Sequence, residues 1–197
     1  FNYCAHMFAY KKKYFLIIQS IRDINLRNIK KYNKFTIIYR NKEIKDNIND
    51  LIKFRKKCRL RAIGFYVANN IKLGVLLKSD GIYLSSYNRT FKTLNLKNLN
   101  LKIIGSAHNV NEIALKLKQG CDYILLSKLF LVDYNNRSPF LGIVKFNKYL
   151  NTISNKLVPL GGVKLSNLNK MKLLNCETFA IMSEIKKKPT KIFSRLF

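Results

Sequence analysis

A chain of 197 residues is long enough for one sizeable hydrophobic core, or for one large and one very small domain. Hydrophobic residues make up 48% and charged residues 24% of it, which excludes a disordered, collagen-like or disulfide-scaffold protein. The formal net charge of +28 is exceptional, and by itself it would suggest nucleic acid or an anionic membrane as the partner.

Eight short apolar runs recur along the chain, with periodic helical stretches between them. Each run is apolar at successive positions, which is typical of a strand that is buried on both faces. The predicted strands are Tyr14–Ile18, Phe35–Tyr39, Gly64–Ala68, Gly81–Leu84, Lys102–Ser106, Tyr123–Leu126, Leu157–Leu160 and Thr178–Met182.

Two of the intervening helices have sequence signals at both ends. Asn109 can cap a helix whose Glu112 reaches back and which ends at Gly120. Ser166 can cap a second helix, with Asn175 as a left-handed stop. Because strand, helix and strand follow one another with short loops, the strands are expected to pair in parallel.

Eight such units in about 200 residues predict a small, single-domain (β/α)8 TIM barrel of the α/β class. The alternative is an open, doubly wound sheet, which the same alternation permits. We expect residues 1–13 to be an N-terminal extension and residues 14–197 to form the barrel.

The positive charge is spread along the chain and is not gathered in one motif. Lys outnumbers Arg 29 to 9, and Asn and Ile are abundant, which is typical of an AT-rich genome. Nucleic acid is therefore not the favoured partner, and no apolar run approaches the roughly 20 residues of a membrane helix. The four cysteines form no C-x-x-C pair, so we expect a cytoplasmic protein. A homo-oligomer is left open.

In a barrel, functional residues lie in the loops after the carboxyl ends of the strands. Gly161 and Gly162 follow the seventh predicted strand, and Met182 and Ser183 end the eighth, which together favour a phosphate site. The alternative for Gly161 and Gly162 is a tight turn without a ligand.

Three further side chains follow other strands. Arg40 and Lys42 come after the second and could hold a phosphate or pyrophosphate, or could simply be solvated. His108 follows the fifth strand, where it could transfer a proton or serve as a structural hydrogen-bonding group.

Several motifs are similar to those of thiamine phosphate synthases and their TenI-like relatives. The segment from Ser79 to Leu84 resembles the family's "ADGVHL" strand, and Gly105 to Asn109 resembles "GvSvHs" with one residue fewer. Gly120 to Phe130 resembles "GADYvllgpvF", and the order of motifs continues to the end of the eighth strand. The resemblance runs from about Tyr14 to Ile185 and is more specific after Gly64.

This resemblance implies a barrel enzyme of thiamine biosynthesis. The synthase couples hydroxymethylpyrimidine pyrophosphate to thiazole phosphate with Mg²⁺, by ionisation of the pyrimidine pyrophosphate and attack of the thiazole nitrogen. The family's pattern places Arg40 and Lys42 at the pyrophosphate, and Asn69 and Ser106 on the pyrimidine side. It places Gly162, Met182 and Ser183 at the thiazole phosphate.

The departures from the family's pattern concern the metal. Its two metal-binding Asp positions are Asn70 and Asn88 here, and neutral amides are poor ligands for Mg²⁺. The Gln that usually precedes the basic pair is Ile38, and the loop after the sixth strand lacks the expected Thr or Lys. Mg²⁺ is therefore expected only if the chain is a true synthase.

Three hypotheses follow. The first is a divergent synthase in which surplus Lys partly replaces the charge of the metal. The second is a TenI-like thiazole tautomerase with His108 as the acid and base and no metal. The third is a non-catalytic protein that binds a phosphate ligand or RNA. We favour the thiamine phosphate synthase family, with small phosphorylated thiazole and pyrimidine ligands and the specific reaction left open.

Overall fold

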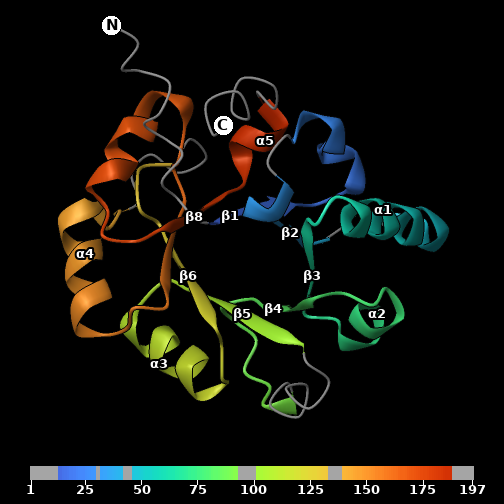
Figure 1. Cartoon of the computed structure of the whole chain (residues 1–197). Coiled ribbons are helices and arrows are strands. Elements are labelled where there is room, and N and C mark those ends of the chain that lie inside the picture. Colours follow the sequence, from blue (N-terminus) through green and yellow to red (C-terminus); the bar gives the residue numbers. More distant parts are fainter. Residues whose placement is uncertain (1–12, 30–31, 42–45, 93–100, 133–138, 188–197) are drawn as a thin grey trace, which may run out of the picture.

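The computed structural model describes residues 13–29, 32–41, 46–92, 101–132 and 139–187, which form one sheet of eight parallel strands (Figure 1). The strands are β1 (Lys13–Ile18), β2 (Phe35–Tyr39), β3 (Gly64–Ala68), β4 (Gly81–Leu84), β5 (Lys102–Ala107), β6 (Tyr123–Ser127), β7 (Leu157–Leu160) and β8 (Thr178–Ile181). From β1 to β7, each strand pairs with the next one in the chain, and β8 pairs with β1. β7 and β8 are in contact without a ladder between them in the described residues, so the barrel is nearly closed. This confirms the predicted barrel.

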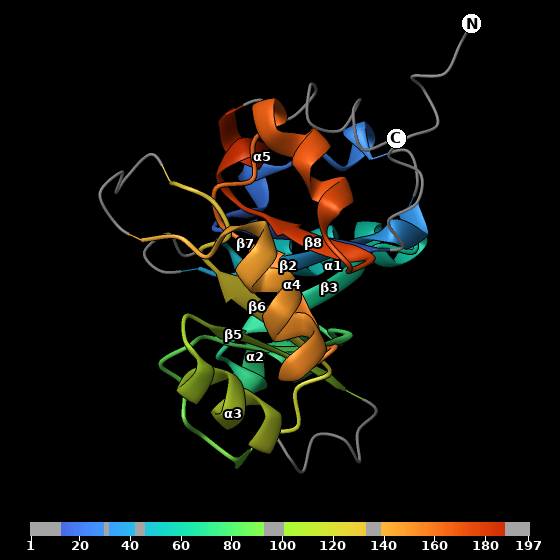
Figure 2. The same cartoon turned by 90° about the vertical axis from the view of Figure 1, so that its left-hand side faces the viewer.

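The helices surround the sheet (Figure 1). They are α1 (Ile48–Leu60), α2 (Ile71–Leu76), α3 (Val110–Lys118), α4 (Gly142–Thr152) and α5 (Ser183–Lys187). The second view shows α4 lying across β7 (Figure 2). The connection between β7 and β8 is a 3-10 helix, Leu165–Leu173, and three single-turn 3-10 helices occupy the connection between β1 and β2.

The start of α3 follows its sequence signals closely. The Asn109 side chain accepts a hydrogen bond from the N–H of Glu112 at 2.9 Å, and the Glu112 carboxylate accepts one from the N–H of His108 at 2.7 Å. The Glu112 carboxylate thus accepts from the N–H of His108, one residue before the cap residue Asn109 whose N–H a capping box would use. Gly120 adopts a φ of 74°, a left-handed conformation suited to the end of a helix.

The second predicted helix is wrong in its details. Its cap is Lys164 and not Ser166, and the segment is 3-10 rather than α-helical. Asn175 does not adopt a positive φ; instead, its N–H donates to the side chain of Asn147 in α4 at 3.0 Å. A local signal for a helix end was therefore overridden by a tertiary hydrogen bond.

The strands are buried on both faces because they separate two apolar layers. The barrel interior is filled by inward-facing residues such as Phe15, Tyr83 and Leu125. The outward-facing residues of the same strands, including Leu16 and Ile124, pack beneath the helices. This explains why the sequence of each strand is apolar at successive positions.

Two aspartates stabilise the amino ends of neighbouring strands. Asp80, just before β4, accepts a hydrogen bond from the N–H of Phe65 in β3 at 2.8 Å. Asp122, just before β6, accepts one from the N–H of Ile103 in β5 at 2.9 Å. These two motif residues therefore lie at the end of the barrel opposite the predicted site. Within the described residues, no helix combines the length and the apolar character that crossing a membrane requires.

Candidate active site at the carboxyl mouth of the barrel

Parallel pairing brings the carboxyl ends of all eight strands to one mouth of the barrel. Most of the predicted site residues follow these ends. They are Arg40 after β2, Asn69 and Asn70 after β3, Asn88 after β4, Ser106 within β5, His108 after β5, Gly161 and Gly162 after β7, and Met182 and Ser183 after β8. Lys42 lies outside the described residues.

Asn69 is the centre of a polar network between the loops after β3 and β4. It adopts a φ of 56°, and its Nδ2 donates to Ser85 Oγ at 2.7 Å and to the Tyr87 hydroxyl at 3.0 Å. Its Oδ1 accepts from the N–H of Ser85 at 3.0 Å and from Asn88 Nδ2 at 3.1 Å. A strained backbone held by four hydrogen bonds is typical of a functional site.

The two residues at the family's metal positions are engaged elsewhere. Asn70 Oδ1 accepts the N–H of Leu73 at 2.9 Å and caps α2, while Asn88 Oδ1 accepts the N–H of Thr90 at 2.9 Å. Neither is a carboxylate, and both amide oxygens already have donors. The described residues contain no group of three or more His, Cys, Asp or Glu side chains that could hold a metal. This donor set does not fit Mg²⁺, which is usually held through carboxylates.

A tyrosine inside the barrel, Tyr83, interacts with Ser106 and is influenced by the charge of Arg40. The Tyr83 hydroxyl and the Ser106 side chain form a hydrogen bond, and the Arg40 charge acts on the same hydroxyl. Burial raises the pKa of Tyr83, whereas Ser106 and Arg40 lower it. Tyr83, which is buried inside the barrel, therefore stays protonated at neutral pH.

Asp46 ties the loops after β1 and β2 together. Its carboxylate accepts hydrogen bonds from Ser20 Oγ at 2.7 Å, from the N–H of Ile21 at 3.1 Å and from the Tyr39 hydroxyl at 3.0 Å. Burial, followed by the bond to Asp46, raises the pKa of Tyr39 to about 12. With three donors, this carboxylate serves to hold the loops that precede Arg40 and α1.

His108 is exposed, and its ring is oriented by the end of β6. Ser127 Oγ and His108 Nδ1 are 2.9 Å apart. No described residue hydrogen-bonds to Nε2, so this nitrogen can face a ligand. A histidine held at one nitrogen and open at the other is suited to proton transfer.

The Gly161-Gly162 loop requires glycine for a steric reason. Both residues have positive φ, at 93° and 68°, and a Cβ on Gly162 would lie 2.5 Å from the carbonyl oxygens of Phe130 and Leu131. The loop after β6 is thus packed directly on this turn. The N–H groups of Gly161, Gly162 and Val163 donate to no described acceptor, which leaves them available to an anion.

The glycine loop and the end of β8 are connected through α5. Glu184, buried in the first turn of α5, accepts from the N–H of Leu165 at 3.4 Å. This bond holds exposed Ser183, the first residue of α5, near the segment that follows the glycines. Met182 is half-buried against the barrel interior.

The loop after β4 is held by two buried side chains, Lys116 of α3 and Gln119 directly after this helix. Lys116 Nζ donates to the carbonyl of Asn88 at 2.7 Å and to Gln119 Oε1 at 2.9 Å. Gln119 Nε2 donates to the carbonyls of Asn88 at 3.1 Å and Thr90 at 2.7 Å. Both side chains are 0% exposed, and burial lowers the pKa of Lys116. No carboxylate of the described residues forms an ion pair with this ammonium, so its hydrogen bonds to the loop and to Gln119 offset the cost of burying it.

Sequence reasoning missed Tyr83, Ser85, Asp46 and Lys116. Tyr83 and Ser85 lie in or directly after a predicted strand, so their places in the register could have indicated them. Asp46 and Lys116 carry no such signal, because only the folded chain brings them to the loops that they hold.

Comparisons with known proteins bear on the family and the fold of the chain. Residues 25–185 match the family model described as thiamine monophosphate synthase. A thiamine-phosphate synthase of Pelagibacter ubique is 27% identical over 192 residues, which cover 87% of each chain. One of Prochlorococcus marinus subsp. pastoris is 29% identical over 141 residues, 71% of this chain but 40% of that protein. The chain thus spans about two fifths of the length of this relative.

A solved structure supports the fold. Thiamine phosphate pyrophosphorylase from Pyrococcus furiosus superposes with a TM-score of 0.73 at 17% identity, covering 95% of this chain and 94% of that one. The family model covers most of the chain, from the connection after β1 to the end of the barrel. The chain therefore belongs to the thiamine monophosphate synthase family.

Proposed function

We propose that this chain couples hydroxymethylpyrimidine pyrophosphate to thiazole phosphate and releases thiamine phosphate and pyrophosphate. One observation carries the proposal: the same mouth holds two separate sets of groups suited to anions. Arg40 with Ser106 forms one, and the N–H groups of Gly161 to Val163, which donate to no acceptor in the described part of the chain, form the other. Two phosphorylated substrates require two such places.

The reaction needs charge stabilisation more than acid or base catalysis. The C–O bond between the pyrimidine methylene carbon and pyrophosphate breaks, and its electron pair leaves with pyrophosphate. The thiazole nitrogen then donates its lone pair to the methylene carbon and forms the C–N bond. A fixed guanidinium beside the leaving group stabilises the charge that develops on it.

The residues of the mouth divide between these two steps. Arg40 binds the pyrophosphate, and Ser106, which is hydrogen-bonded to buried Tyr83, orients the pyrimidine. The Asn69 network fixes the loops after β3 and β4 around the same ring. The glycine loop, with Met182 and Ser183, holds the thiazole phosphate so that its nitrogen faces the methylene carbon.

The divergent metal positions shape this proposal. Because Asn70 and Asn88 do not suit Mg²⁺, the charge that a metal would supply falls in part to lysine and arginine side chains of this unusually basic chain. No step of the proposed mechanism depends on a metal held by these two residues. We propose a reducing compartment such as the cytoplasm, because the four cysteines of the sequence form no C-x-x-C pair.

The direct test supplies purified protein with both precursors and follows thiamine phosphate by chromatography, in Mg²⁺ and in EDTA. We expect product in Mg²⁺, and a smaller loss of rate in EDTA than an enzyme with two metal carboxylates would show. Absence of product under both conditions contradicts the proposal.

His108 supports a second candidate, thiazole tautomerisation. Its Nδ1 is held by Ser127 while Nε2 is open, which is the arrangement that moves a proton between two positions of a ligand. The test is turnover of a thiazole carboxylate phosphate by the wild type and by His108→Ala. Turnover that survives the substitution contradicts this role of His108.

A further inference from the structure

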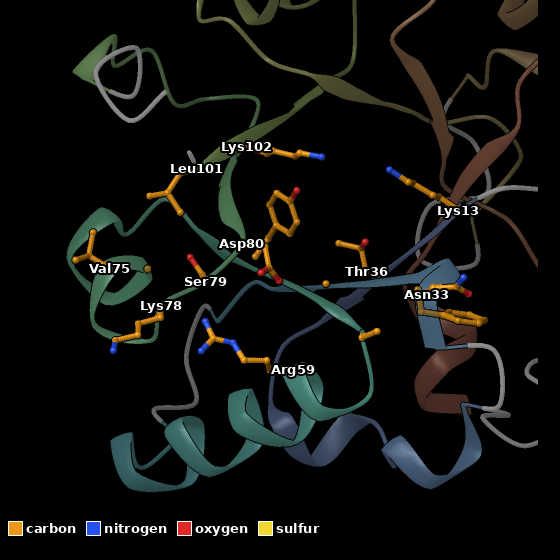
Figure 3. Close-up of a pocket in the computed structure, with 15 residues that line it drawn as sticks. Lys13, Asn33, Thr36, Arg59, Val75, Lys78, Ser79, Asp80, Leu101 and Lys102 are labelled. Carbon is orange, nitrogen blue, oxygen red and sulfur yellow. The ribbon is translucent and has the colours of Figure 1, made fainter. Parts of the chain in front are cut away.

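A hollow of about 700 Å³ lies at the opposite end of the barrel from the proposed active site (Figure 3). It is lined by residues at or near the amino ends of β1 to β5 and by the carboxyl-terminal ends of α1 and α2. None of the mouth residues described above lines it. Its volume is within the range of small-molecule sites, about 300–1,000 Å³.

Four cationic side chains from different elements line this hollow. Lys13 comes from β1, Arg59 from α1, Lys78 from the turn after α2 and Lys102 from β5. Figure 3 shows Lys13 and Lys102 extending toward each other from opposite sides. Among the described residues, none of the four has a carboxylate partner; Lys13 Nζ instead lies 5.7 Å from the centre of the Tyr123 ring.

The acidic residue of the hollow does not neutralise these charges. Asp80 Oδ1 pairs with Arg55 at 2.8 Å, and its Oδ2 accepts the N–H of Phe65 at 2.8 Å. Arg55 also donates to the carbonyl of Lys78 from Nε at 3.1 Å and from Nη2 at 3.0 Å, which fixes the guanidinium beside Asp80. Within the part of the chain that the structure describes, the hollow therefore keeps a net positive charge, which an anionic ligand or solvent ions can balance.

A buried hydroxyl points to a ligand independently of charge. Tyr66 lines the hollow, is 7% exposed and has no hydrogen-bond partner among the described residues. Buried tyrosine hydroxyls usually have a partner. Burial, followed by the charges of Asp80 and Asp122, raises the pKa of Tyr66, so its hydroxyl keeps its proton and can donate.

The abundance of lysine in the chain does not by itself explain this arrangement. A second hollow at the same end of the barrel, of about 790 Å³, is lined by Tyr123, Leu157, Thr178 and their neighbours, without any Lys or Arg. Two adjoining hollows of similar size thus differ in charge, and the basic one also contains the unpaired hydroxyl.

We propose that the hollow between Lys13, Tyr66 and Lys102 is a second binding site, for a small phosphate-bearing anion with at least two negative charges. Lys13 and Lys102 bind the anion from two sides, and the Tyr66 hydroxyl donates to one of its oxygens. Arg59 and Lys78 extend the site toward α1 and α2 and bind a second phosphate group. The site is separate from the mouth and stands whether or not the coupling reaction occurs there.

The test is a lysine footprint of the whole protein at about 0.15 M salt, where diffuse ionic contacts are largely screened. The protein is briefly acetylated with and without inorganic pyrophosphate, at matched ionic strength, and each lysine is quantified by mass spectrometry. We expect several-fold slower acetylation of Lys13, Lys78 and Lys102. Lys53 on α1 and Lys148 on α4, both exposed and outside the hollow, serve as controls and should not change.

Two variants separate this site from the mouth. Tyr66→Phe removes only the hydroxyl and is expected to raise the pyrophosphate concentration needed for protection by about threefold to tenfold. Arg40→Gln is expected to leave protection of Lys13 and Lys102 unchanged. Equal protection of Lys53 and Lys148, no protection at all, or protection indifferent to Tyr66→Phe overturns the proposal.

Discussion

No side chain fits at Gly162, because backbone atoms of the loop after β6 lie directly against it. Its φ of 68° is unfavourable for any other L-residue, and a Cβ would meet two carbonyl oxygens at 2.5 Å. Backbone atoms cannot move aside as a side chain can. The contact fixes the glycine loop against the loop after β6, and so fixes the N–H groups that we assign to the thiazole phosphate.

Gly162→Ala should therefore destabilise the protein much more than an alanine at a positive φ that meets no clash. We expect a loss of about 3 kcal/mol in the free energy of unfolding, from left-handed strain together with the clash. Gly142→Ala is the matched control, because Gly142 has a φ of 74° but nothing within 4 Å of the added Cβ, and should cost about 1 kcal/mol. Urea denaturation of both variants measures the difference, and equal losses would show that the backbone contact is unimportant.

The conformation of the loop after β4 depends on side chains that are remote from it in the sequence. Lys116 and Gln119 hold the carbonyls of Asn88 and Thr90, and the methylene stem of Lys116 passes over Gly105 in β5. A Cβ on Gly105 would lie 2.8 Å from Lys116 Cδ. The glycine of the "GSAH" segment thus makes room for the lysine that orders the neighbouring loop.

Replacing Lys116 by Met keeps the buried stem and removes the ammonium. We expect amide hydrogen exchange to rise about tenfold in residues 85–92, while overall stability changes little, because removing a costly buried charge offsets the lost hydrogen bonds. Lys118→Met, an exposed position on the same helix, is the control. Unchanged exchange in the loop would contradict the assigned role of Lys116.

The same element shows what the sequence could and could not predict. The eight strands and the cap of α3 are predictable, because burial on both faces and Asn109 with Glu112 leave strong local signals. The bonds of Lys116 join residues 28 positions apart, and those of Asp46 join residues up to 26 apart. Contacts of this kind depend on the closed fold and leave no periodic or motif signal in the sequence.

At the scale of the whole molecule, buried tyrosines make the stability of the fold depend on pH in the alkaline range. Burial raises the pKa of Tyr14 and of Tyr39 to about 12, from an ordinary value of 10.0. Above pH 10 the unfolded chain loses these protons while the folded one keeps them, so stability falls as pH rises from 10 to 12. Burial also raises the pKa of the Cys58 thiol from 9.0 to about 12, which starts the loss near pH 9.

Urea unfolding at pH 8, 10 and 11 should show this loss. Each buried tyrosine contributes about 1.4 kcal/mol per pH unit above pH 10. The lowered pKa of Lys116 acts in the opposite direction, but only up to the ordinary pKa of lysine near 10.5. Tyr39→Phe removes one titrating group and should make the decline shallower. Constant stability from pH 8 to 11 would contradict this account of the core.

Our central proposal is that the carboxyl mouth binds pyrophosphate through Arg40, whose charge also acts on the Tyr83 hydroxyl. The most direct test is kcat/KM for thiamine phosphate formation by Arg40→Gln, with Arg27→Gln as the control. Arg27 is exposed, and the carbonyl of its neighbour Leu26 binds Arg61, just after the end of α1 and away from the mouth. We predict a fall of about a hundredfold for Arg40→Gln and no change for the control. Equal activity of the two variants would contradict the claim.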